Sequence, residues 1–99
     1  MDLEQLQTEL ERLIKEVTSD NFQAYYGRFE QAILAYRNTG APGRPVYEHL
    51  LKLDRKYSDV NQWKDEILLD IMNRISGFAP PFRKIIFDDF DEQRGTWRL

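Results

Sequence analysis

The feature that most constrains the fold is the spacing of apolar side chains in the first seventeen residues. The spacing steps by 3, 4, 3 and 4 through Leu3, Leu6, Leu10, Leu13 and Val17. Such steps place all of these side chains on one narrow stripe of an α-helix, as in a heptad repeat. We therefore predict an amphipathic helix over residues 2–17 whose stripe packs against one neighbouring helix.

Apolar residues recur at helical spacing in three further segments, which predicts helices over about 20–38, 45–57 and 59–76. The residues at 39–45 are rich in glycine and proline and predict a loop. Asp20 with Gln23, and Asp59 with Gln62, have the spacing of capping boxes that begin a helix. Gly77 is a natural helix terminator. A glycine within a helix costs about 1 kcal/mol relative to alanine. Gly27 therefore predicts close approach by another backbone, from this chain or from a second copy.

The last segment begins where Pro80-Pro81 breaks the helical pattern. Helical spacing of the apolar residues that follow predicts a short fifth helix over about 81–90 and a less regular tail, although acidic residues would crowd that helix's negative end. The predicted fold class is all-α: a four-helix bundle or two helical hairpins, with a short fifth helix or an irregular C-terminal segment. We expect residues 1–77 to form the bundle, and residues 78–99 to form an aromatic and acidic segment that packs on the bundle or on a partner.

Composition excludes most catalytic chemistry. The 99 residues include no cysteine and a single histidine, so thiolate chemistry, zinc sites and paired histidine ligands are ruled out. No phosphate-binding glycine loop is present. Glu66, Asp70 and Arg74 fall on one helix face, where they are expected to be solvated surface charges. We therefore expect no enzyme activity, no catalytic residue, no metal, no cofactor and no small-molecule substrate.

The net charge of −3 and the absence of a long apolar run predict a soluble protein with no membrane association. The first residues show no basic region followed by an apolar stretch, and with the lack of cysteine this predicts a cytoplasmic location.

The expected function is protein binding, as an adaptor, assembly factor or regulatory subunit. The segment after residue 77 alternates aromatic and acidic residues, which suits anchoring in a groove with a charged rim. The candidate protein-binding residues are Phe82, Ile85, Ile86, Phe87, Asp88, Asp89, Phe90 and Trp97. The partner's identity stays open, as do homodimer formation and whether this segment packs within the chain or on the partner.

Two alternatives stay open. His49-Leu50-Leu51-Lys52 resembles the His-x-Leu-Lys order of histidine phosphotransfer domains, which implies a helical phosphorelay protein with His49 as phosphoacceptor. The resemblance covers four residues, and Leu53 stands where that family has glycine. The second alternative is a nucleic-acid-binding regulator, for which the overall acidic charge is unfavourable. Its candidate contacts are Arg37, Arg44, Lys52, Arg55 and Lys56.

Overall fold

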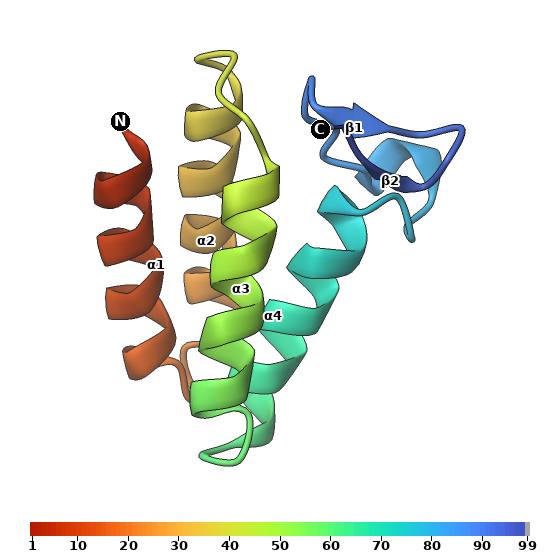
Figure 1. Cartoon of the computed structure of the whole chain (residues 1–99). Coiled ribbons are helices and arrows are strands. Elements are labelled where there is room, and N and C mark those ends of the chain that lie inside the picture. The colour runs from red at the N-terminus through yellow and green to blue at the C-terminus, as the bar shows by residue number, and fades with distance from the viewer. Residues whose placement is uncertain (99) are drawn as a thin grey trace.

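The computed structural model describes residues 1–98, and within that range most of the regular structure is helical (Figure 1). The helices are α1 (Leu3–Glu16), α2 (Phe22–Arg37), α3 (Arg44–Tyr57) and α4 (Gln62–Ile75). A single 3₁₀ turn (Pro81–Arg83) and two antiparallel strands follow, β1 (Phe90–Asp91) and β2 (Thr96–Trp97), with Phe90 opposite Trp97. The all-α prediction is confirmed.

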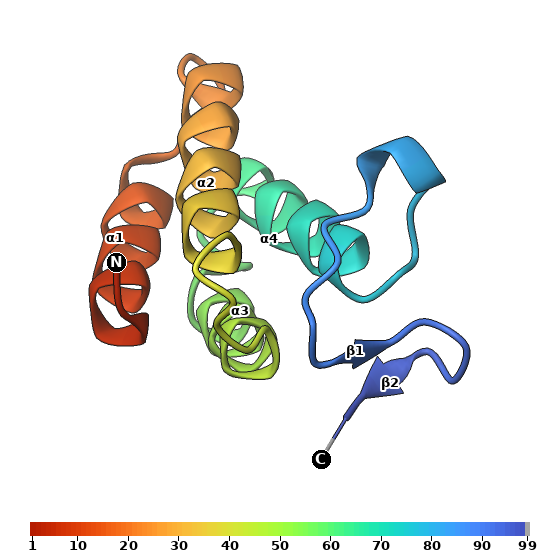
Figure 2. The same ribbon diagram turned by 90° about the horizontal axis from the view of Figure 1, so that it is seen from above.

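The core forms where the apolar stripes of the four helices meet. The predicted stripe of α1 is almost wholly buried, since Leu6, Leu10, Leu13 and Val17 have no exposed surface. Helices α1, α2 and α3 run side by side, whereas α4 is inclined to them and carries the C-terminal segment away from α1 (Figures 1 and 2). This inclination separates α2 from α4 toward the end of the bundle where α4 terminates.

Both predicted capping boxes are wrong, because the N-cap is Asn21 instead of Asp20 at α2 and Asn61 instead of Asp59 at α4. Helix α4 starts after Asn61, whose side-chain oxygen accepts the Lys64 backbone N–H at 3.0 Å. The Asn61 amide also donates to the Val17 carbonyl at 3.2 Å, which ties this cap to the end of α1. At α2 the N-cap is Asn21, whose side chain bonds backbone groups of Thr18 and Glu16 instead of the new helix.

For Gly27, the structure contradicts close approach by another backbone of this chain, and approach by a second copy stays a prediction. A Cβ added at Gly27 would meet no atom within 4 Å, so no other backbone approaches this face of α2. The tightly packed glycine is Gly43, at the start of α3. A Cβ there would overlap the Phe87 ring and lie 2.7 Å from the Phe87 Cβ.

The predicted fifth helix over 81–90 is wrong as well. After the 3₁₀ turn the chain is extended, and it buries Ile85 and Phe87 against the bundle core, each with 1 % of its surface exposed. The Asp89 carboxylate accepts the backbone N–H groups of Gly43 and Arg44, at 2.7 and 3.1 Å. Because Gly43 has no side chain to cap α3, the acid stabilises the positive end of that helix instead of crowding the negative end of its own.

Candidate functional site

The predicted protein-binding residues do not form one exposed surface. Ile85, Phe87 and Phe90 are buried, while Ile86, Asp89 and Trp97 are half-buried. Asp88 is exposed, and Phe82 is the most exposed of the aromatic members, at 86 %. Phe78, which was not among the candidates, is 75 % exposed. The exposed aromatic surface of this segment is therefore the short loop between α4 and the extended chain.

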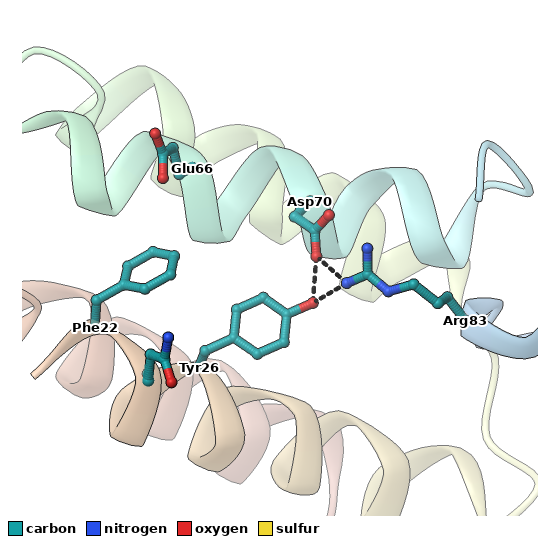
Figure 3. A pocket seen from close by; sticks show the side chains of 6 residues that line it. Phe22, Tyr26, Glu66, Asp70 and Arg83 are labelled. Atoms are coloured by element: carbon teal, nitrogen blue, oxygen red, sulfur yellow. Dashed lines mark hydrogen bonds and ion pairs between the residues drawn. The ribbon is translucent and has the colours of Figure 1, made fainter. Parts of the chain in front are cut away.

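A groove of about 560 Å³ lies beside this loop, between α2 and α4 (Figure 3). It is lined by Phe22, Gln23, Tyr26, Glu66, Asp70 and Arg83. Figure 3 shows the rings of Phe22 and Tyr26 reaching from α2 toward α4, and the Arg83 guanidinium closing one end. The other end, between Phe22 and Glu66, carries no such closure.

The closed end is held by hydrogen bonds that converge on the Tyr26 hydroxyl. This hydroxyl donates to the Asp70 carboxylate, and it accepts from Arg83 Nη2 at 3.1 Å and Arg74 Nη1 at 3.0 Å. Arg83 Nη2 also donates to Asp70 Oδ2 at 2.9 Å. Burial raises the pKa of Tyr26, and the bond to Asp70 raises it further, so the phenol stays protonated near neutral pH.

Arg74 joins this network to the core. Its guanidinium pairs with Glu30 Oε2 at 2.5 Å, and its Nε donates to the Arg83 carbonyl at 2.6 Å. Although burial opposes the charge, the bonds to Glu30 and Tyr26 raise the pKa of Arg74. The expectation of solvated charges on this face of α4 is correct for Glu66 but wrong for Arg74, which is 8 % exposed. A sequence signal for its burial exists, since Arg74 is in helical register with the core residues Ile67 and Ile71.

The charges of the closed end are balanced. Glu30 is paired with Arg74, and Asp70 with Arg83. Glu66 makes no ion pair or side-chain hydrogen bond with any residue in the range 1–98. The groove therefore has a neutralised closed end and one uncompensated carboxylate at its open end.

The candidate phosphoacceptor His49 lies on α3 with its imidazole packed toward α1. Its Nε2 atom is buried and has no hydrogen-bond partner among the described residues. Burial lowers the pKa of His49, partly offset by a backbone hydrogen bond with Gln7. The Nε2 atom is therefore out of reach of a phosphodonor in this conformation.

The candidate nucleic-acid contacts do not gather on one patch. Arg37 and Arg44 flank the α2–α3 loop, whereas Arg55 and Lys56 lie at the opposite end of α3, about 16 Å away at 1.5 Å per residue. Lys56 is paired with Glu11 at 2.8 Å, and Arg44 lies 3.8 Å from Glu48. Lys52 is exposed between the two groups. These basic side chains are spread out and partly neutralised. They therefore lack the concentrated positive potential that nucleic-acid binding needs.

A second cluster of charged side chains, near the α3–α4 turn, makes the stability of the fold depend on pH. Burial raises the pKa of Asp54 to about 6, and the neighbouring carboxylates of Asp65 and Asp59 add to the shift. Asp54 Oδ1 is buried without a hydrogen-bond partner among the described residues. The folded chain therefore binds a proton at this site more tightly than the unfolded chain does.

We predict that Asp54→Asn changes how stability depends on pH. A raised folded-state pKa contributes stability that is full below pH 3.8 and is lost as the pH rises through about 6. The variant should match the wild type near pH 4 and exceed its free energy of unfolding by about 1–2 kcal/mol at pH 7.5, after allowance for solvent screening. Urea denaturation across pH 4–8 measures this, with Glu48→Gln on α3 as control. Parallel curves for wild type and Asp54→Asn would contradict it.

Comparison with protein-family models, curated proteins and solved structures finds no match. In the range 1–98, no three histidine, cysteine, aspartate or glutamate side chains are grouped so that they could hold a metal ion. None of the helices described is both long enough and apolar enough to cross a membrane.

Proposed function

We propose that this chain is a non-catalytic protein-interaction module, acting in the cytoplasm as an adaptor, assembly factor or regulatory subunit. The observation that carries the proposal is the exposure of two phenylalanines on one short loop, Phe78 at 75 % and Phe82 at 86 %. Large aromatic side chains dominate the binding energy of many protein interfaces.

The backbone that presents these two side chains is fixed on both sides. The Phe78 N–H donates to the Asn73 carbonyl at 2.9 Å, and the Ile85 N–H donates to the Arg74 carbonyl at 3.0 Å. Between them, two consecutive prolines restrict the chain, and the Arg83 side chain is bonded to Tyr26 and Asp70. A loop held in this way loses little conformational entropy when a partner binds, so more of the contact energy is kept as affinity.

The reactive groups of the chain support a binding role over catalysis. The buried Nε2 of His49 is not placed to exchange protons with a substrate, and the Tyr26 phenol is held protonated. The carboxylates of Asp70 and Glu30 are each neutralised by an arginine. These ion pairs hold the C-terminal segment against α2 and α4. The loop that carries Phe78 and Phe82 stays exposed and can contact a partner.

We predict that Phe78→Ser combined with Phe82→Ser weakens partner binding at least about tenfold, because each exposed anchor contributes on the order of 1 kcal/mol or more. The partner is captured with the wild-type chain, identified by mass spectrometry and purified. Its dissociation constant is then measured by calorimetry. Light scattering on the chain alone tests whether the partner is a second copy.

The control is Val60→Ser, which removes another exposed apolar side chain, 63 % exposed, in the turn before α4 and so at the far end of that helix from the loop. This variant should bind as the wild type does. Equal binding by the double variant would refute the role of the loop. Failure of the wild type to bind itself or any purified partner would refute the proposed function.

A further inference from the structure

We propose that the open end of the α2–α4 groove binds an arginine side chain of the partner protein. The inference rests on the proposed function and names the chemistry of its partner. It follows from three properties of this end of the groove: an aromatic platform, an unpaired carboxylate, and the absence of a cation from this chain.

The platform is the ring of Phe22, which lines the groove and contacts the ring of Trp63. Their ring centroids are 5.2 Å apart at an angle of 62°, an edge-to-face contact that fixes both rings. Both side chains also pack against the core, so Phe22 cannot turn away without exposing apolar surface. Figure 3 shows the Phe22 ring reaching toward the side of α4 that carries Glu66.

The carboxylate of Glu66 is placed one helical turn beyond Trp63, on the same side of α4. Because Arg83 and Arg74 are committed to Asp70 and Glu30, no cation of the groove is left for Glu66. The six lining residues carry two acids and one base, which gives the groove a net charge of −1. A ligand that completes this site must therefore be positively charged.

Arginine fits this combination better than lysine does. Its planar guanidinium stacks on an aromatic face while its edge donates two parallel hydrogen bonds to a carboxylate, whereas an ammonium is a compact, strongly hydrated charge. Its aliphatic stem can lie along Phe22, and the side-chain oxygen of Gln23 is a further acceptor on the rim. The exposed Phe82, next to Arg83, would contact apolar residues that flank the arginine in the partner.

The test uses a defined probe, an N-acetylated tetrapeptide amide with two arginines between two leucines, and its neutral isostere with citrulline in place of arginine. Binding is followed by the indole N–H signals of the two tryptophans in nuclear magnetic resonance spectra. Trp63 contacts Phe22, so its signal reports on binding at the Phe22 end of the groove. Trp97, which packs on Phe90 in the hairpin, is an internal reference.

We predict that the arginine peptide shifts the Trp63 signal saturably in the millimolar range and leaves Trp97 in place. The citrulline peptide should bind more weakly, and Glu66→Gln should weaken the arginine peptide about three- to fivefold, as expected for one exposed ion pair. Glu48→Gln, which removes a similarly exposed carboxylate from α3, should leave the dissociation constant unchanged.

Several results would overturn the inference: no saturable shift of Trp63, equal binding of the citrulline peptide, or an unchanged dissociation constant for Glu66→Gln. A purified partner that depends on Phe78 and Phe82 but is indifferent to Glu66→Gln would overturn it while leaving the proposed function intact. Displacement of the peptide by a second copy of the chain would make that copy the source of the arginine.

Discussion

Replacing Phe87 with alanine is expected to lower the free energy of unfolding by about 3–5 kcal/mol, as for other aromatic residues removed from a core. Only 1 % of Phe87 is exposed, and its ring lies 6.3 Å from the ring of Tyr36 and 6.4 Å from that of Trp97. Its loss leaves a cavity beneath the α2–α3 loop and releases the hairpin. Urea denaturation followed by circular dichroism measures the change.

The matched control is Phe82→Ala, five residues earlier in the same segment. Because Phe82 is 86 % exposed, this change should alter the free energy of unfolding by no more than about 0.5 kcal/mol. A cost below about 1 kcal/mol for Phe87→Ala would mean that the segment after residue 77 is an appended arm and not part of the core.

The second large effect is expected at two glycines that respond to alanine in opposite directions. Gly43→Ala should destabilise the chain by about 1–3 kcal/mol, because the added methyl group would overlap the buried Phe87 ring. Gly27→Ala should stabilise it by about 0.5–1 kcal/mol, since that site lies within α2 and has no atom within 4 Å. Thermal and urea unfolding of both variants provide the measurement.

A destabilising Gly27→Ala would show that a second chain covers α2 in solution, because no residue in the range 1–98 occupies that space. A neutral Gly43→Ala would show that Phe87 can move aside at little cost. The combination Gly43→Ala with Phe87→Leu should recover part of the lost stability, since the smaller side chain leaves room for the methyl group.

The helices could be predicted because their spacing is a local property. The stripes of α1 and α3 are buried as their periods of three and four indicate, and Gly77 follows the end of α4 with a positive φ of 85°. At α2, the Asn21 side chain bonds backbone groups of Thr18 and Glu16 and does not cap the helix, so no capping pattern marks this start. The start of α4 could not be placed, because its cap depends on a tertiary bond. Asn61 caps α4 while it bonds Val17, a residue 44 positions earlier in the chain.

For the C-terminal segment, the helical period that the sequence predicts is wrong. Phe82, Ile85, Ile86 and Phe90 match a helix, but Ile85 and Phe87 are buried while Asp88 is exposed, which is closer to the alternation of an extended chain. Two neighbouring prolines already make a helix difficult to begin at this position. The contact that fixes this segment joins Asp89 to the start of α3, 46 residues away. No short stretch of the sequence can predict a contact over that separation.

The groove could not be predicted for the same reason. Its closed end joins Tyr26 to Asp70 across 44 residues and to Arg83 across 57. In the sequence, Tyr26 is one of several aromatic residues of a predicted helix and Asp70 lies on a polar helix face. Arg83 is a basic residue shortly after two prolines. Only the packing of α2, α4 and the C-terminal segment against one another brings them together.

The hydrogen bonds from the amides of Gly43 and Arg44 to Asp89 also affect when α3 can be completed during synthesis. On the ribosome, the third helix is synthesised about 45 residues before the carboxylate that satisfies its first turn. Until that carboxylate emerges, the amides of this turn have only water as a partner. A chain that stops before residue 87 would therefore lack both the Phe87 ring that packs beside Gly43 and the Asp89 carboxylate that anchors this turn.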